Sequence, residues 1–168
     1  MNNFHSFEVN RRMLLKNLLE NQKENDKIAV IYGQKSISYK EIHHMVLTAA
    51  SNLKPKSEND YCIGLFLHNS INYIVAYFSI SYAGKVIVPI DPRSKQSELI
   101  STIEYCELKV IAADSKSIAL LRKFLKDYTY EIMLFNIDNM SFERVGGIAT
   151  LPNSDGNELH LCCIHQVP

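Results

Sequence analysis

Apolar residues recur first at helical spacing and then in the short runs that are typical of strands. Residues 7–22 place leucines three and four positions apart among charged residues, which predicts an opening helix. Residues 28–32 and 36–38 are two short β-prone runs joined by Gly33-Gln34-Lys35. A glycine in a short connection can adopt positive φ, so these runs predict a hairpin.

A second helical pattern follows the hairpin. Ser38 and Glu41 have capping-box spacing, in which each residue satisfies an amide left unpaired at a helix start. Pro55 limits how far this helix can continue. One face is expected to point inward, formed by Ile42, Met45, Val46, Ala49, Ala50 and Leu53.

Strand-like and helix-like segments alternate between residues 61 and 135. The continuous apolar runs are typical of strands covered on both faces, and their alternation with helices predicts a mainly parallel sheet with helices on both faces. Strands are expected at 61–67, 86–90, 108–113 and 131–135, with helices at 71–82, 96–107 and 116–126. Ser70 caps the first of these helices, whose inward face is expected to hold Ile71, Ile74, Val75, Phe78 and Tyr82.

The pattern fades after residue 135. Residues 136–157 have the glycine, proline, asparagine and aspartate content of loops. The complete prediction is therefore an α/β fold, with a mainly parallel sheet, helices on both faces and an amino-terminal hairpin.

Composition narrows the function classes. The 168 residues carry 18 basic and 18 acidic side chains, and 46% are hydrophobic, a composition that fits a globular protein. This charge balance gives no general attraction to nucleic acid or to an anionic membrane, both of which need a concentrated positive patch. No segment has the pattern of a secretory signal or the roughly 20 apolar residues of a membrane span. A cytoplasmic location is expected. The cysteines are interpreted as free thiols, namely Cys62, Cys106, Cys162 and Cys163.

Three ordered segments carry a family resemblance: residues 37–42 (ISYKEI), residues 67–70 (LHNS) with the helix after them, and residues 83–92 (AGKVIVPIDP). Together they resemble the amino-terminal part of the AMP-forming, acyl-adenylate-forming ligases, which include acyl-CoA synthetases and peptide-synthetase adenylation domains. The resemblance covers roughly residues 26–114. His68, where proline is common in the family, and Lys85, where a small residue is common, depart from its pattern without touching a family catalytic position.

The resemblance implies that the parent enzyme activates a carboxylic acid with ATP and Mg, and transfers the acyl group to a thiol such as coenzyme A. The family's phosphate-binding loop, ribose-binding acid and assisting lysine have no counterparts in these 168 residues. No catalytic, cofactor-binding or metal-binding residue is therefore assigned here. The chain is expected to be an inactive amino-terminal fragment, truncated from a larger ligase domain, with a leading helix and linker at 1–26, an α/β subdomain at 27–136 and a loop region with a frame-shifted tail at 137–168.

The tail hypothesis rests on codons. If Cys162 to Pro168 are written as TGT TGT ATA CAT CAG GTA CC, reading from the third base gives Leu-Tyr-Thr-Ser-Gly-Thr, which resembles the opening of the family's phosphate loop. One base lost just after Leu159 would explain both the loop's absence and the unrelated residues that follow.

Several residues invite competing interpretations. Cys162, Cys163 and His165 suggest a zinc site, but adjacent cysteines depart from the usual ligand spacing, and the shifted frame explains them better. His43 and His44 lie within a predicted helix and are interpreted as surface residues rather than as a catalytic base.

The ends of the predicted strands offer further candidates. His68 follows a strand, where ligands of open parallel sheets gather, but no nucleophile or carboxylate is spaced to it. Asp91 and Arg93 could touch a ligand there, although ordering of their turn is the preferred interpretation. Four tyrosines are interpreted as half-buried packing rather than as a stacking platform, namely Tyr39, Tyr73, Tyr77 and Tyr82.

Two further functions stay open. The fragment could be a non-catalytic module that self-associates or binds partners through an exposed sheet surface. A flavodoxin-like nucleotide binder is a weaker alternative, because no glycine-rich turn follows an early strand.

Overall fold

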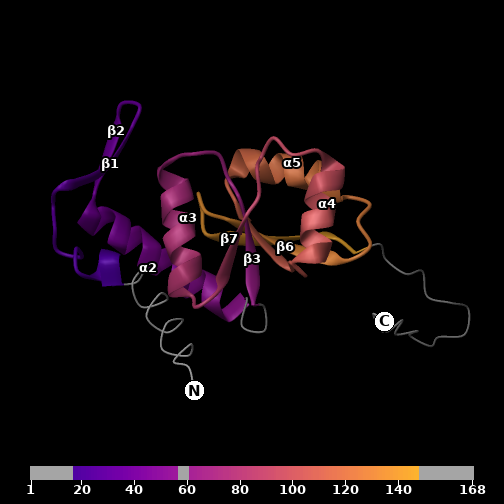
Figure 1. Cartoon of the computed structure of the whole chain (residues 1–168), viewed down its shortest axis with the longest axis horizontal. Coiled ribbons are helices and arrows are strands. Elements are labelled where there is room, and N and C mark those ends of the chain that lie inside the picture. The colour runs from indigo at the N-terminus through magenta and orange to yellow at the C-terminus, as the bar shows by residue number, and fades with distance from the viewer. Residues whose placement is uncertain (1–16, 57–60, 148–168) are drawn as a thin grey trace, which may run out of the picture.

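The amino-terminal hairpin stands apart from the main sheet (Figure 1). The computed structural model describes residues 17–56 and 61–147, and residues 17–20 are helical. Strands β1 (Ile28–Tyr32) and β2 (Lys35–Ser38) pair antiparallel, as predicted. Lys35 pairs with Tyr32, so the turn is one residue shorter than expected, and Gly33 takes a φ of 61° in it.

The capping box is present at the junction of β2 and α2 (Tyr39–Lys56). The Ser38 amide donates to Glu41 Oε2 at 2.8 Å, and the Glu41 amide donates to Ser38 Oγ at 3.3 Å. The helix ends one residue after Pro55. Its buried face agrees with the predicted one except that Met45 is only half-buried and His43 is buried as well.

The main sheet has five strands in the order β4-β3-β5-β6-β7. The first four are parallel to one another, and β7 runs antiparallel to β6, so the sheet is mainly parallel as expected. Their bounds are β3 Cys62–Phe66, β4 Val86–Pro89, β5 Val110–Ala113, β6 Glu131–Asn136 and β7 Ser141–Gly146.

Helices cover both faces of this sheet (Figure 1). Helices α2 and α3 (Ile71–Tyr82) pack with one apolar cluster, and α4 (Gln96–Tyr105) and α5 (Ser115–Leu125) pack with a second. Alternate residues of β3 explain the two clusters, because Ile63 and Leu65 face the first and Phe66 faces the second. The predicted three-layer arrangement is therefore confirmed.

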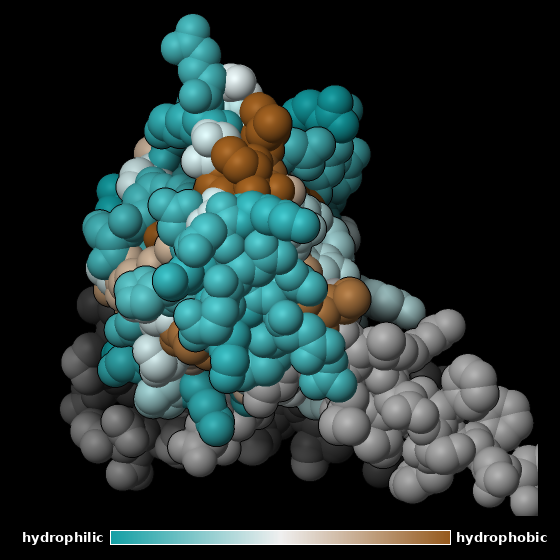
Figure 2. All heavy atoms as spheres, turned by 90° about the vertical axis from the view of Figure 1, so that its left-hand side faces the viewer, coloured by the Kyte–Doolittle hydropathy of each residue, from teal (hydrophilic) through white to brown (hydrophobic). Residues whose placement is uncertain are grey.

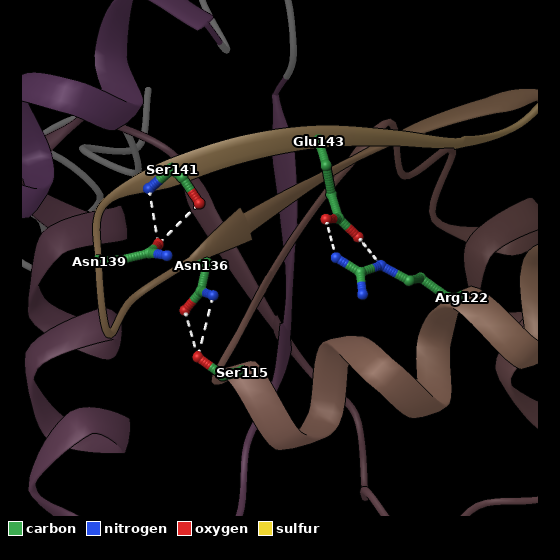
Figure 3. Close-up of polar contacts among 6 residues, drawn as sticks. All are labelled: Ser115, Arg122, Asn136, Asn139, Ser141 and Glu143. Carbon is green, nitrogen blue, oxygen red and sulfur yellow. Dashed lines mark hydrogen bonds and ion pairs between the residues drawn. The ribbon is translucent and has the colours of Figure 1, made fainter.

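Strand β7 is the main correction. Residues 136–157 were expected to be loop, but residues 141–146 form a strand along the full length of β6. Its sequence alternates too weakly to indicate a strand, since half-buried Phe142 and Val145 flank two charged residues. Pairing with β6 sets the register of β7. Arg122 of α5 also holds the strand through a bidentate ion pair with Glu143 (Figure 3).

Two burial expectations are also wrong. Strand β4 is an edge strand with half-buried residues, and Pro89 is exposed where an edge tolerates a missing amide. In α3, Val75 is buried as expected, but the other members of the expected stripe are only half-buried, and the remaining buried residues are Ala76, Ser79 and Ile80. The reason is that α3 packs against α2 as well as the sheet, and Ser79 Oγ lies 3.3 Å from the Val46 carbonyl oxygen.

Candidate functional site at the carboxyl edge of the sheet

The carboxyl ends of the parallel strands form the edge at which this topology positions ligands. Strand β3 connects through α3 to β4 on one side, whereas the next connection, through α4, returns to β5 on the other side. This reversal makes a topological switch point between β3 and β5, and open α/β sheets bind ligands in the crevice outside it. The loops after these strands are therefore the candidate site.

A cavity of about 580 Å³ lies at the outer part of this edge, after β3 and β4. His68 is exposed at the end of β3, as predicted, and lines the cavity with Tyr73, Asp91 and Arg93. No nucleophile or carboxylate is spaced to His68 in the sequence, but the turn after β4 places Asp91 in the same cavity wall.

Asp91 and Arg93 order their own turn, as the preferred interpretation stated. Arg93 Nη2 donates to Asp91 Oδ2 at 2.7 Å, Arg93 Nε donates to Oδ1 at 3.0 Å, and the Arg93 amide donates to Oδ1 at 2.9 Å. The hydrogen bonds from Arg93 lower the pKa of Asp91 to about 2, and the field of His68 adds a smaller lowering. The guanidinium is therefore already engaged by a carboxylate.

A polar network occupies the switch point itself, and sequence reasoning missed it. Asp138, in the turn after β6, accepts hydrogen bonds from Asn72 Nδ2 at 2.6 Å and from the amide and hydroxyl of Ser115 at 2.8 and 2.7 Å. Asn136 Nδ2 donates to Ser115 Oγ at 3.1 Å, a contact visible in Figure 3. The available signal was a row of Asn, Asp and Ser residues just after strands, but residues 136–138 had been interpreted as loop.

His43 corrects the expectation of a surface histidine. His43 is only 8% exposed, and its Nε2 lies 3.2 Å from Glu20 Oε2. Tyr82 Oη donates a hydrogen bond to the same oxygen at 3.3 Å. The hydrogen bond from His43 lowers the pKa of Glu20, and burial raises the pKa of Tyr82 to about 12. His43 is covered because Glu20, in the helical residues 17–20, contacts it, whereas His44 is exposed as expected.

The tyrosine interpretation is confirmed. Tyr39, Tyr73, Tyr77 and Tyr82 are all half-buried and pack against the apolar cluster of α2 and α3. Tyr73 and Tyr77 stack on each other with ring centres 6.4 Å apart. Packing between side chains one turn apart accounts for this spacing.

The structure describes only part of the chain in which a metal site or a membrane-spanning helix could be sought. Cys162, Cys163 and His165 lie outside the described residues, as does the tail to which the frame-shift hypothesis refers. Within residues 17–56 and 61–147, no three His, Cys, Asp or Glu side chains gather as metal ligands would. No helix in these same ranges has the length and apolar character to cross a bilayer.

Comparison with known proteins agrees with the topology. Residues 19–156 match the family described as AMP-binding enzyme. Indigoidine synthase of Streptomyces lavendulae is 30% identical over 62% of this chain, and gramicidin S synthase 2 of Brevibacillus brevis is 27% identical over 80% of it. The chain spans only 8% and 3% of the length of these two relatives.

Solved structures show the same fold. The o-succinylbenzoate CoA synthetase of Bacillus subtilis, in complex with its acyl-adenylate intermediate, superposes on 74% of this chain with a TM-score of 0.63 and 16% identity. The luciferase-like enzyme of Zophobas morio superposes on 71% with a TM-score of 0.62 and 21% identity. The chain covers 25% and 29% of these two structures.

Proposed function

Because this chain belongs to the AMP-binding enzyme family, we propose that it forms the amino-terminal part of an enzyme that activates a carboxylic acid with ATP. The family match over residues 19–156 carries the proposal. The likeness to a solved adenylate-forming fold supports it, since 74% of the chain superposes on that structure. The sequence relatives, gramicidin S synthase 2 among them, are peptide synthetases with adenylation domains, which favours an amino acid or a related acid as the substrate class.

The proposed reaction has two steps. The substrate carboxylate attacks the α-phosphorus of ATP, forming acyl-AMP and releasing pyrophosphate. A thiol, such as that of coenzyme A or a carrier protein, then attacks the acyl carbon and AMP leaves. Mg²⁺ would neutralise phosphate charge in the first step. Since the reaction consumes ATP and a cellular thiol, we place it in the cytoplasm.

We further propose that the 168 residues alone do not catalyse adenylation. Charge that develops on transferring phosphate needs preorganised amide donors and cations around it. Arg93 is the cation that lines the carboxyl-edge cavity among the described residues, and it is engaged by Asp91. The glycine-rich phosphate loop expected from the family does not occur in the printed sequence.

The frame-shift hypothesis gives this proposal its experiment. One gene form encodes the 168 residues, and a second restores one base after Leu159. Both purified products are tested for acid-dependent exchange of pyrophosphate into ATP, with pools of amino acids and aryl acids. Exchange is expected with the restored product alone. Exchange above background by the 168-residue chain would contradict its proposed inactivity, and a restored frame that encodes no phosphate loop would contradict the frame-shift hypothesis.

An interaction module is the second candidate function. Three large apolar residues of the hairpin are exposed: Ile28 by 54%, Ile31 by 74% and Tyr32 by 53%. Figure 2 shows hydrophobic surface gathered on the protruding hairpin. Contiguous exposed apolar surface favours association. Light scattering at increasing concentration tests this candidate, because self-association raises the apparent mass and a constant monomer mass contradicts it.

A further inference from the structure

Asp138 joins helices that lie on opposite faces of the sheet. Its Oδ1 accepts a hydrogen bond from Asn72, in the first turn of α3, and its Oδ2 accepts two from Ser115, the first residue of α5. Helix α3 packs with the apolar cluster on one face, and α5 packs with the cluster on the other. One carboxylate therefore spans the carboxyl edge between the two helix layers.

The turn that carries Asp138 is itself tightly held. The Asp138 amide donates to Asn136 Oδ1 at 3.0 Å, and Asn136, only 9% exposed, also contacts Ser115. On the other side of the turn, the amide and hydroxyl of Ser141 donate to Asn139 Oδ1 at 3.1 and 2.7 Å (Figure 3). The position of Asp138 is therefore set by hydrogen bonds on both sides of it.

Met140 shows that the turn is strained. Its φ is 59°, a conformation that is costly for a bulky side chain, at about 1–2 kcal/mol. Its side chain packs against the apolar cluster of α2 and α3. A strained backbone persists only where its surroundings over-determine it, so contacts at both ends of the turn maintain this geometry.

We propose that residues 137–140 form a clasp that couples the amino-terminal ends of α3 and α5 across the switch point between β3 and β5. The clasp sets the spacing of the amino-terminal ends of these two helices. The clasp proposal does not depend on the proposed adenylation activity, because it is argued from hydrogen bonds within the chain and involves no ligand. A simpler alternative is that Asp138 only caps α5, in which case the bond from Asn72 would have no effect on Ser115.

The two alternatives differ in what Asn72 does. In the clasp, the bond from Asn72 restrains the carboxylate that accepts from Ser115, so loss of Asn72 weakens a hydrogen bond on the opposite face. In the simple cap, each bond acts alone. Hydrogen exchange of the Ser115 amide, followed by NMR in the intact chain, reports this bond directly.

The test compares Asn72→Ala and Asp138→Ala with two matched controls. Asn52→Ala removes an amide that bonds to the Thr48 carbonyl within α2, and Asp127→Ala removes a carboxylate paired with Lys126. For the clasp we expect Ser115 exchange to rise about tenfold in Asp138→Ala and about threefold in Asn72→Ala. Both controls are expected to stay at the wild-type rate.

An unchanged Ser115 rate in Asn72→Ala would overturn the proposal and leave only a cap on α5. A rise of equal size in Asn52→Ala would also overturn it, because the effect would then be global. If Asp138→Ala fails to fold, Asn72→Ala and its control still decide between the alternatives. The adenylation assay has no bearing on this outcome, so the two proposals can fail separately.

Discussion

The two sheets of this protein use similar residues in opposite ways. In the hairpin, Ile31 is 74% exposed, whereas Ile111 in β5 is fully buried. All four residues of β5 are buried because strands lie on both sides of it and helices cover both faces. The hairpin has two strands and packs on α2 with one face only. The comparison shows that the number of strands and helices packed around a strand, rather than the strand's own apolar character, decides how much its burial stabilises the protein.

The largest effect should come from truncating the two isoleucines. We expect Ile111→Ala to lower the free energy of unfolding by about 2–5 kcal/mol, since it leaves a cavity in a packed core. Ile31→Ala should change it by about 0.5 kcal/mol or less, because its side chain is already in water. Urea denaturation of both variants measures the difference. Equal losses would mean that the hairpin face is covered in solution, as self-association requires.

Two glycines provide the next comparison. Gly146, at the end of β7, has a φ of 73°, and an added Cβ would lie 2.5 Å from the Tyr130 carbonyl oxygen. Gly33 has a φ of 61° with open space around it. We expect Gly146→Ala to cost about 2–4 kcal/mol, from backbone conformation plus the clash, and Gly33→Ala about 1 kcal/mol. Thermal unfolding of the two variants checks the order, and a costlier Gly33→Ala would contradict it.

Helix caps should matter similarly in both regions. Ser38 caps α2 beside the hairpin, and Ser70 Oγ accepts from the Tyr73 amide at the start of α3. We expect Ser38→Ala and Ser70→Ala each to cost about 1 kcal/mol, because capping is local and does not depend on layering. Chemical denaturation provides the values. A cost confined to Ser70→Ala would indicate that the hairpin end of α2 frays in solution.

The smallest effect on stability concerns Asp91. Hydrogen bonds from Arg93 lower the pKa of Asp91 to about 2, so in the folded chain this carboxylate stays charged at pH values below the ordinary pKa of Asp. The stabilisation it contributes is present above the unfolded pKa and is lost as the pH falls toward 2. NMR titration should show Asp91 ionising near pH 2, and Arg93→Gln should return its pKa toward the ordinary value. An ordinary pKa in the unmutated chain would contradict the ion pair.

Local signals predicted most of the fold. The capping box at Ser38 and the cap at Ser70 specify helix starts by residues three positions apart, so their spacing is visible in sequence. Strands β3 and β5 were recognisable as continuous apolar runs. Strand β7 was not, because its pairing with β6 and the ion pair between Arg122 and Glu143 join residues distant in sequence.

The site was predicted less completely for the same reason. His68 and the turn of Asp91 and Arg93 were located correctly, since each follows a strand. The Asp138 network was missed because its partners, Asn72 and Ser115, are 66 and 23 residues away. His43 was misinterpreted because its partner Glu20 lies on a different helical segment. The division of the chain at residues 26 and 136 stays a prediction.

The central proposal is that these 168 residues form part of the fold of an adenylating enzyme but do not hold a triphosphate by themselves. Titration of the purified chain with ATP and Mg²⁺, followed by amide chemical shifts, tests this most directly. We expect no saturable change at the loops after β3, β4 and β5. Saturable shifts of His68, Arg93 and Ser115 at micromolar ATP would contradict the claim.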